Sequence, residues 1–321
     1  MICPNRYGYE DRNLVDNGGW LDEVLWVANT DNEDDLRYLD EIIASDPIRH
    51  KKITLPGDKL WVYTYYKAWQ HLERGKYYVK IDDDVVWIDD DAIPQLVNRK
   101  ITHPNDLVVS ANIINNPPLG FLHYHMGALH PYLPETEKPT NVSDSWRPSL
   151  DPFWEGPSGF TWPLDKDPPY RPHRWLRVKE HKMLYQTPAA QIKYEVWGDS
   201  YTSWAIATQM HYSLLENIEN DGLGLYKFSR PWDMGGERIR INFICVFADD
   251  LLDTNIEHWP EGKGDEDMIV EELPKQLKRP VVIMGEALGA HFQYSDQGKL
   301  ADTDLLARYQ NLALERACLP R

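Results

Sequence analysis

Hydrophobic and polar positions along the first third of the chain follow two alternating periods. Short apolar, β-prone runs precede segments with an apolar residue every three or four positions, as at Leu36, Leu39 and Ile42. A strand–helix order that repeats in this way predicts an α/β fold with a mostly parallel sheet and helices on its faces. The expected strands are 23–29, 51–55, 76–84 and 106–112, and the expected helices are 30–46, 57–75 and 89–99.

The second part of the chain opens with a segment that has no clear period. Residues 131–190 are rich in Pro, Trp and charged residues. We expect an ordered insertion over the ligand-bearing edge of the sheet, because its aromatic side chains need burial. The elements predicted after it are a helix at 199–220, a strand at 238–250, a helix at 265–277, a strand at 279–285 and a helix at 301–316. We interpret residues 1–321 as one domain.

The charge balance limits the classes of partner. Lys and Arg number 34 against 51 Asp and Glu, a formal net charge of -17. Such a chain cannot neutralise a phosphate backbone, so we expect no nucleic-acid partner. No apolar run approaches the length of a membrane span, and no signal peptide opens the chain.

Three consecutive aspartates, Asp82, Asp83 and Asp84, follow the strand predicted at 76–84. Strand side chains alternate, so Asp82 and Asp84 are expected on one face and Asp83 on the other. Two carboxylates on one face suit Mn²⁺ or Mg²⁺ with positions left open for phosphate oxygens. The alternative is an acidic turn that caps the strand. Asp89–Asp91 is better explained by the dipole of the helix that follows it.

His291 comes late in the chain, after a predicted strand and a Gly-containing loop. A neutral imidazole would complete an oxygen-rich site and favour Mn²⁺ over Mg²⁺. The alternative is an ordinary hydrogen-bonded, half-buried histidine. His123, His125 and His130 are the competing candidates for a metal-ligating histidine.

A second acidic cluster, Asp265, Glu266 and Asp267, stands at a predicted helix start behind Gly262 and Gly264. Carboxylates there stabilise the helix dipole, which is the plain explanation. The functional hypothesis makes one of them a general base directed at a hydroxyl group.

The stretches VKIDDDVVWI, DED and AHF, in this order, resemble the GT-A fold glycosyltransferases. The three-Asp form of the DxD motif is similar to that of the Fringe-like branch. The runs YYVKIDDDVVWI, TSWAIATQMHYSLLEN and ERIRINFICVFADD look closest to fungal glycosyltransferase-like proteins, and this broader similarity covers most of the chain. Such proteins begin with a strand under the nucleoside, of which this chain is expected to keep at most a stub.

The resemblance implies transfer of a sugar from a nucleotide donor, most often a UDP-sugar, to a hydroxyl of a glycan or glycoconjugate, with inversion. It implies that residues 1–130 bind the donor and metal and that 131–321 form the acceptor side. The rival functions are a metal-dependent phosphoester or nucleotide-sugar hydrolase and an inactive sugar-binding relative. The compartment stays open between the cytoplasm and the Golgi lumen, with an anchor outside this chain. The implied residues are Asp82, Asp84 and His291 for Mn²⁺ or Mg²⁺; Asn29, Thr30, Asp31, Lys59, Asp82 and Asp83 for the donor; and Asp267, then Glu266, as the base.

Overall fold

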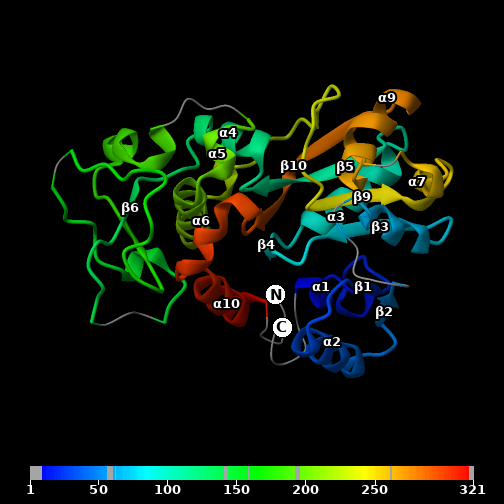
Figure 1. Cartoon of the computed structure of the whole chain (residues 1–321), viewed down its shortest axis with the longest axis horizontal. Helices are drawn as coiled ribbons and strands as arrows, with labels where there is room; N and C mark the ends of the chain where they lie inside the picture. Colours follow the sequence, from blue (N-terminus) through cyan, green and yellow to red (C-terminus); the bar gives the residue numbers. More distant parts are fainter. Residues whose placement is uncertain are drawn as a thin grey trace.

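The computed structural model describes residues 9–55, 61, 63–140, 144–157, 159–191, 196–260 and 262–317. Its centre is a mixed sheet with helices around it, and the predicted α/β class is confirmed (Figure 1). The first helix, Tyr9–Arg12, and the last helix, Leu305–Arg316, lie on the same side of this sheet in Figure 1, and Arg12 donates to the Arg316 carbonyl at 3.3 Å. The position of the functional site follows from the order of the strands.

Six strands form the main sheet within the described residues. Their order is β3–β9–β5–β10–β4, and β8 pairs with the first half of β10. β3 and β4 are separated in sequence only by Asp82–Asp84, yet they stand at the two ends of this order. Neighbouring strands lie about 4.8 Å apart, so a flat sheet would not allow this connection. The register shift in β10 between Met284 and Leu288 is one place where the sheet departs from a flat arrangement. The strands are β3 Tyr77–Ile81, β4 Val85–Ile88, β5 Val108–Ile114, β8 Trp232–Asp233, β9 Phe243–Phe247 and β10 Val281–His291.

The prediction of a mostly parallel sheet is wrong for this main sheet. Within the described part, only β5 and β10 pair in parallel, and the pairs β3–β9, β5–β9, β4–β10 and β8–β10 are antiparallel. The alternating pattern ends before β9, which inserts antiparallel between β3 and β5. The strand β4 was hidden in the sequence because it follows the acidic turn directly. Residues 76–84 therefore form a strand and a turn.

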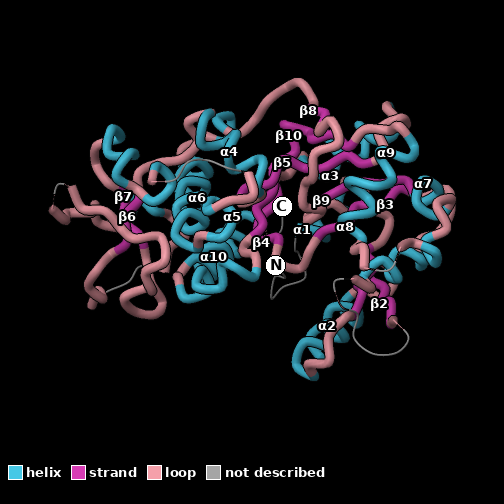
Figure 2. Tube along the Cα trace, turned by 45° about the horizontal axis from the view of Figure 1, so that its top comes forward, coloured by secondary structure: helices cyan, strands magenta, loops and turns pink. Residues whose placement is uncertain are grey.

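The first strand–helix–strand unit stands apart from the main sheet. β1 (Val24–Ala28) and β2 (His50–Thr54) pair with each other in parallel, joined by α2 (Glu33–Ser45). Figures 1 and 2 show α2 and β2 projecting to one side. No residue of α2 is buried, and Val27 in β1 is 43% exposed, so the expected buried strand is only half covered. Asn32, rather than Thr30 or Asp31, caps α2, accepting a hydrogen bond from the Asp34 amide.

The largest helix, α6 (Trp204–Glu219), lies almost wholly in the core. The helix predicted at 199–220 is broken at Ser203, which caps α6 by accepting from the Ile206 amide. The helix predicted at 265–277 consists of α8 (Asp265–Asp267), a π-helical turn (Met268–Glu272) and α9 (Leu273–Leu277). The remaining α-helices are α1 Tyr9–Arg12, α3 Ala92–Thr102, α4 Pro117–His125, α5 Asp199–Thr202, α7 Ala248–Leu252 and α10 Leu305–Arg316.

Short 3-10 helices connect several of these elements. The helix predicted at 57–75 is a 3-10 helix, η2 (Tyr65–His71), in its described part, and Trp61 before it is 74% exposed. The others are η1 Val15–Asn17, η3 Pro148–Leu150, η4 His181–Gln186, η5 Pro188–Ala190, η6 Leu223–Leu225, η7 Ile256–His258 and η9 Ser295–Asp302.

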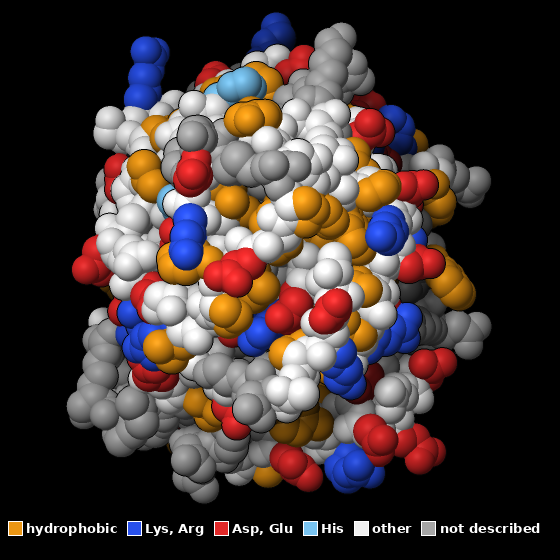
Figure 3. Space-filling model, turned by 90° about the vertical axis from the view of Figure 1, so that its left-hand side faces the viewer, with side chains coloured by type: hydrophobic (Ala, Val, Ile, Leu, Met, Phe, Trp, Pro, Cys, Tyr) orange, Lys and Arg blue, Asp and Glu red, His pale blue; other side chains and the backbone are white. Residues whose placement is uncertain are grey.

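The Pro- and Trp-rich insertion is folded over its described length. β6 (Tyr132–Pro134) and β7 (Trp175–Arg177) pair, and Trp146, Trp162 and Trp175 are at most 1% exposed. The insertion packs on α6, α10 and η9, away from the sheet (Figure 1), so its expected position over the ligand-bearing edge is wrong. These three tryptophan side chains belong to the hydrophobic core. Figure 3 shows this side of the molecule, where hydrophobic and charged side chains of both signs are interspersed.

None of the helices in the described ranges is both long and apolar enough to cross a membrane.

Candidate functional site

Three strands of the main sheet end at the same edge. β5 and β10 are parallel, and β3 runs in the same direction because both it and β5 are antiparallel to β9. The residues that follow or end these strands are Asp82, Asn115 and His291. Ligands of open α/β sheets bind beyond the carboxyl ends of strands. The structure thus brings Asp82 and His291 to the edge where a ligand is expected.

Asp82 is held by two partners. Its carboxylate forms an ion pair with Lys80 and accepts a hydrogen bond from Asn242 Nδ2 at 3.0 Å. Lys80 also donates to the Ile241 carbonyl at 2.9 Å. Burial opposes the charge of Lys80, but Asp82 and Asp265 outweigh it and raise the pKa of this amine. The first aspartate of the triplet is therefore a fixed, charge-compensated group.

Asp84 pairs with His291. Oδ2 of Asp84 lies 3.0 Å from Nε2 of His291, and the Phe292 amide donates to the Asp84 carbonyl at 2.8 Å. His291 is 2% exposed, while the Asp84 side chain is 39% exposed. Nδ1 of His291 is buried and finds no hydrogen-bond partner among the described residues. The imidazole thus reaches the site through Nε2.

Asp83 is the exposed member of the triplet, as its expected opposite orientation requires. Partial loss of solvent, with the charges of Asp84 and Asp82 beside it, raises the pKa of its carboxyl group. The carboxylates thus repel one another, and only Asp82 has a cation next to it.

An aromatic and cationic cluster adjoins this pair. The Tyr294 ring lies 4.2 Å from that of His291, and its hydroxyl donates to Asn242 Oδ1 at 3.1 Å. The Arg240 guanidinium lies over Tyr294, Tyr201 and Trp197, at 5.3, 5.2 and 5.5 Å from the ring centroids. Trp197 is 40% exposed, so an aromatic face and a fixed positive charge meet solvent here.

The acidic helix start faces the same arginines. Glu266 Oε1 accepts from both Arg238 and Arg240, the latter at 2.9 Å. Asp267 has one arginine partner, Arg238 at 2.9 Å, and its Oδ2 accepts from the Gly264 amide at 3.0 Å. The structure therefore confirms the helix-capping role of Asp267. The π-helical turn that follows is a form often found at functional sites.

A divalent ion requires a small number of ligand atoms at suitable distances from one another. Among the described residues, no three His, Cys, Asp or Glu side chains are grouped closely enough to enclose a metal. Mg²⁺-type sites, however, need only one or two carboxylates when substrate phosphates supply the rest. Two ligands at right angles on such an ion, each about 2.1 Å away, are about 3.0 Å apart. Asp84 Oδ2 and His291 Nε2 have this separation and fit as two donors.

The competing histidines are occupied elsewhere. Nε2 of His123 lies 2.7 Å from Asn112 Oδ1, and Nε2 of His130 lies 2.7 Å from Asn217 Oδ1. His125 contacts the ring of Phe121 on the surface side of α4. These pairings fit structural histidines.

The predicted donor-binding residues near the N-terminus are not joined to this site by strand pairing. Asn29, Thr30 and Asp31 follow β1, and β1 pairs with β2 alone in the described sheets. Thr30 bonds to Asp35 at 3.2 Å, within the start of α2. Lys59 lies outside the described residues. A donor-binding role for this group stays a prediction.

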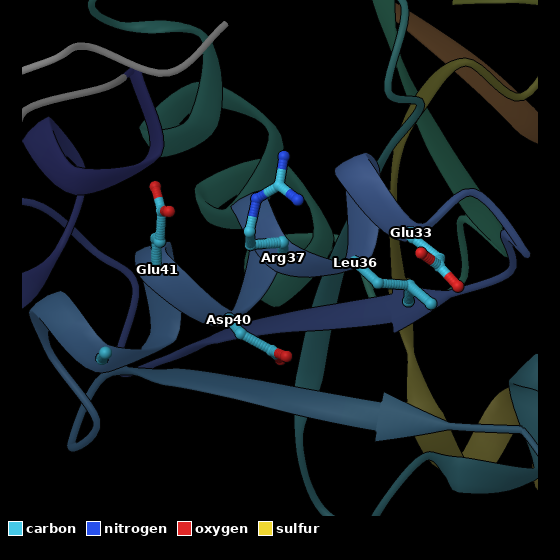
Figure 4. Close-up of a pocket in the computed structure, with 6 residues that line it drawn as sticks. Glu33, Leu36, Arg37, Asp40 and Glu41 are labelled. Carbon is cyan, nitrogen blue, oxygen red and sulfur yellow. The ribbon is translucent and has the colours of Figure 1, made fainter.

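A shallow hollow of the surface lies elsewhere. It runs along α2 and is lined by Glu33, Leu36, Arg37, Asp40, Glu41 and Ala44 (Figure 4). All six come from one helix, and the labelled side chains point in different directions. It is an exposed helix face with no convergent polar groups, so it makes a poor candidate site.

Several residues of the site escaped sequence reasoning. Lys80, Asn242, Tyr294 and Arg240 were not singled out, although they connect the predicted groups. Lys80 stands two residues before Asp82 on the same strand, and this period-two spacing was the available signal. Nothing in the sequence pairs Asn242 with Asp82, because strand register decides that contact.

No family model, curated protein or solved structure matches this chain. The resemblance to GT-A glycosyltransferases therefore stays a prediction that rests on the residues.

Proposed function

We propose that this chain is a metal-dependent glycosyltransferase that moves a sugar from a nucleotide donor, a UDP-sugar, to a hydroxyl acceptor with inversion. The observation that carries the proposal is the meeting of Asp82, Asp84 and His291 at one edge of the sheet, although His291 is remote from both in sequence. A chance acidic turn has no need of a buried histidine beside it.

The residues around this pair suit a diphosphate ligand. Asp84 and His291 would hold Mn²⁺ or Mg²⁺, which when bound would neutralise the negative charge of the diphosphate. Arg238 and Arg240 place two permanent positive charges near the same edge, and the half-exposed Trp197 offers a flat apolar face. Lys80 and Asn242 hold the Asp82 carboxylate in place.

Asp267 is the better of the two candidate bases. Glu266 is shared by two arginines, whereas Asp267 has one arginine and one backbone amide. Each such partner favours the charged form and weakens a base. The carboxylate with fewer cations is the one more able to take a proton from an acceptor hydroxyl.

Sugar binding without catalysis is the second candidate. The ion pairs that hold Glu266 and Asp267 favour it, because a carboxylate fixed by arginine is a poor base. Under this alternative, glycans bind without any dependence on metal or nucleotide. A hydrolase would instead release the sugar from the nucleotide without an added acceptor.

The deciding experiment is thermal unfolding of the whole chain with UDP, Mn²⁺, both together, or both with a chelator. Ligands that bind only the native state raise the melting temperature. The proposal expects UDP and Mn²⁺ together to raise it by more than the sum of their separate effects. Equal stabilisation by UDP in the chelator would exclude this type of site. Incubation of UDP-sugars with and without glycan acceptors then separates transfer from hydrolysis.

A further inference from the structure

The buried side-chain amide of Asn116 makes no hydrogen bond within the described part of the molecule. Asn116 is 1% exposed, and neither its Nδ2 nor its Oδ1 has a partner among the described residues. A buried polar group without a partner is costly, so native proteins retain few of them. Asn112, four residues earlier in β5, shows the usual arrangement, because its side-chain amide is hydrogen-bonded to Tyr226, Gly285 and His123.

The local sequence removes one of the two ordinary hydrogen-bond donors for the Asn116 side chain. Asn116 is the N-cap of α4, and an N-cap side chain normally accepts from the amides two or three positions further on. The first of these positions is Pro118, which has no N–H, so only the Leu119 amide at the second could serve as a donor. The side chain makes no capping bond in this structure. The amide therefore remains available for another group.

The preceding residue fixes this turn to the metal-ligand strand. Asn115 adopts φ of 62°, a left-handed conformation that Asn tolerates. Its Nδ2 donates to the carbonyls of His291, at 3.3 Å, and Phe292, at 2.8 Å. The position of Asn116 is thus tied to the end of β10.

A small cavity lies against Asn116. Its lining includes Ser200, Tyr201 and Tyr294, and it leaves about 10 Å³ into which the centre of a water molecule fits. That is room for about one water or one hydroxyl group. Tyr294 lines this cavity and stacks on His291, so the cavity and the Asp84–His291 pair share a wall.

The geometry points to Asn116 as the residue that recognises one hydroxyl of a sugar bound at the Asp84–His291 edge, through hydrogen bonds to that hydroxyl. This inference rests on the glycosyltransferase proposal, since it names what that site recognises. The amide would both donate to and accept from the hydroxyl, which would occupy the cavity. A site built to bond a hydroxyl rejects sugars that lack one in that place. Asn116 is a specificity-determining residue under this inference.

The test compares the whole chain with its Asn116→Leu and Asn116→Ala variants. Calorimetric titrations in Mn²⁺ use UDP, UDP-glucose, UDP-galactose and UDP-N-acetylglucosamine. We expect the natural chain to bind one UDP-sugar more tightly than UDP. In both variants the affinity for UDP should stay within about twofold, whereas the affinity for that UDP-sugar should fall roughly tenfold or more. Unchanged UDP-sugar binding, or equal losses for UDP and UDP-sugar, would overturn the inference.

Stability gives a second, independent readout. Asn116→Leu removes an unpartnered amide, so its melting temperature should rise by about 2 °C or more. The matched control is Asn112→Leu, which removes three hydrogen bonds made from β5, four residues earlier, and should lower the melting temperature. A fall for Asn116→Leu as well would assign its amide to a permanent structural water and overturn the inference.

Failure of the underlying proposal is recognised separately. If the natural chain binds neither UDP nor any UDP-sugar, the glycosyltransferase proposal fails. Ligand-observed NMR with free glucose, galactose and N-acetylglucosamine then decides the role of Asn116. Binding that disappears in Asn116→Ala supports a sugar-reading amide in a non-catalytic protein. Absence of binding, or binding that the variant retains, overturns it.

Discussion

Nε2 of His291 lies 3.0 Å from Oδ2 of Asp84, and this contact ties the end of β10 to the turn after β3. The histidine is buried while the carboxylate is partly exposed. A rigid imidazole behind an accessible carboxylate is a suitable arrangement for a divalent ion that also needs ligand oxygens. The proposed chemistry depends on this contact, so the first prediction concerns it.

Asp84→Asn should abolish the joint stabilisation by UDP and Mn²⁺. The amide keeps the shape of the side chain but removes the charge that attracts the cation. Asp91→Asn is the matched control, because Asp91 is an exposed carboxylate of the same acidic stretch, residues 82–91. Thermal unfolding of both variants with UDP, Mn²⁺ and the combination measures the effect. Equal loss in the two variants would mean that the acidic turn attracts cations without a specific site.

Asp267→Asn should leave UDP and metal binding nearly unchanged while sugar transfer falls by roughly a hundredfold or more. Asn preserves the oxygen that accepts from the Gly264 amide, so the helix start should stay intact. Transfer is followed by release of UDP in the presence of a glycan acceptor. Glu272→Gln is the control, since Glu272 pairs with Lys263 further along the same segment.

Near-normal transfer by Asp267→Asn would assign this residue to helix capping alone. Loss of UDP binding in the same variant would place Asp267 in the donor site. Retention of the anomeric configuration in the product would remove the need for a base at either Asp267 or Glu266.

Acid should destabilise the fold through its buried histidines. Burial lowers the pKa of His123 to about 3, against an ordinary 6.5 in the unfolded chain, and that of His211 to about 4. As the pH falls, His123 and His211 bind protons in the unfolded chain while they stay neutral in the native protein. The free energy of unfolding is therefore highest above pH 6.5 and falls as the pH drops toward the native pKa values.

The contribution of His123 is measurable by urea unfolding between pH 7 and 4. His123→Gln should reduce the pH slope of the unfolding free energy by about 1.4 kcal/mol per pH unit in this window. An unaltered slope for His123→Gln would show that this ring binds protons in the native protein as readily as in the unfolded chain, and would contradict the lowered pKa.

The insertion should be fixed to α10 by a buried ion cluster. Asp151 accepts from Arg174 at 3.0 Å and from Arg308 at 2.7 Å, and its side chain is 3% exposed. Asp151→Asn leaves Glu135 as the anion for Arg174 and Asp304 as the anion for Arg308, and the loss of two charge-assisted hydrogen bonds should cost about 2 kcal/mol of stability. The exposed pair of Asp167 and Lys299 is the comparison, and Asp167→Asn should have no measurable effect on urea unfolding. Similar midpoints for the two variants would contradict the structural role of the cluster.

The sequence by itself determined the local secondary-structure elements and the residue types that could bind a metal or act in catalysis. Apolar periodicity located β3, β5 and α6 within a few residues, because side-chain burial repeats with the period of the element. The sequence also identified the acidic turn and His291 as candidate metal ligands, since residue type alone decides which atoms can coordinate an ion. The capping role of Asp267 followed from its place at a helix start.

Only the tertiary structure decided how these elements meet. The antiparallel insertion of β9, the separate position of β1 and β2, and the pairing of Asp82 with Lys80 and Asn242 depend on strand register and on contacts between distant segments. The orphaned amide of Asn116 was equally hidden, because a missing hydrogen bond can be recognised only when every neighbour has a position. Periodicity reports which side of an element is buried, but it carries no information on what buries it. That choice is made by packing across the whole chain.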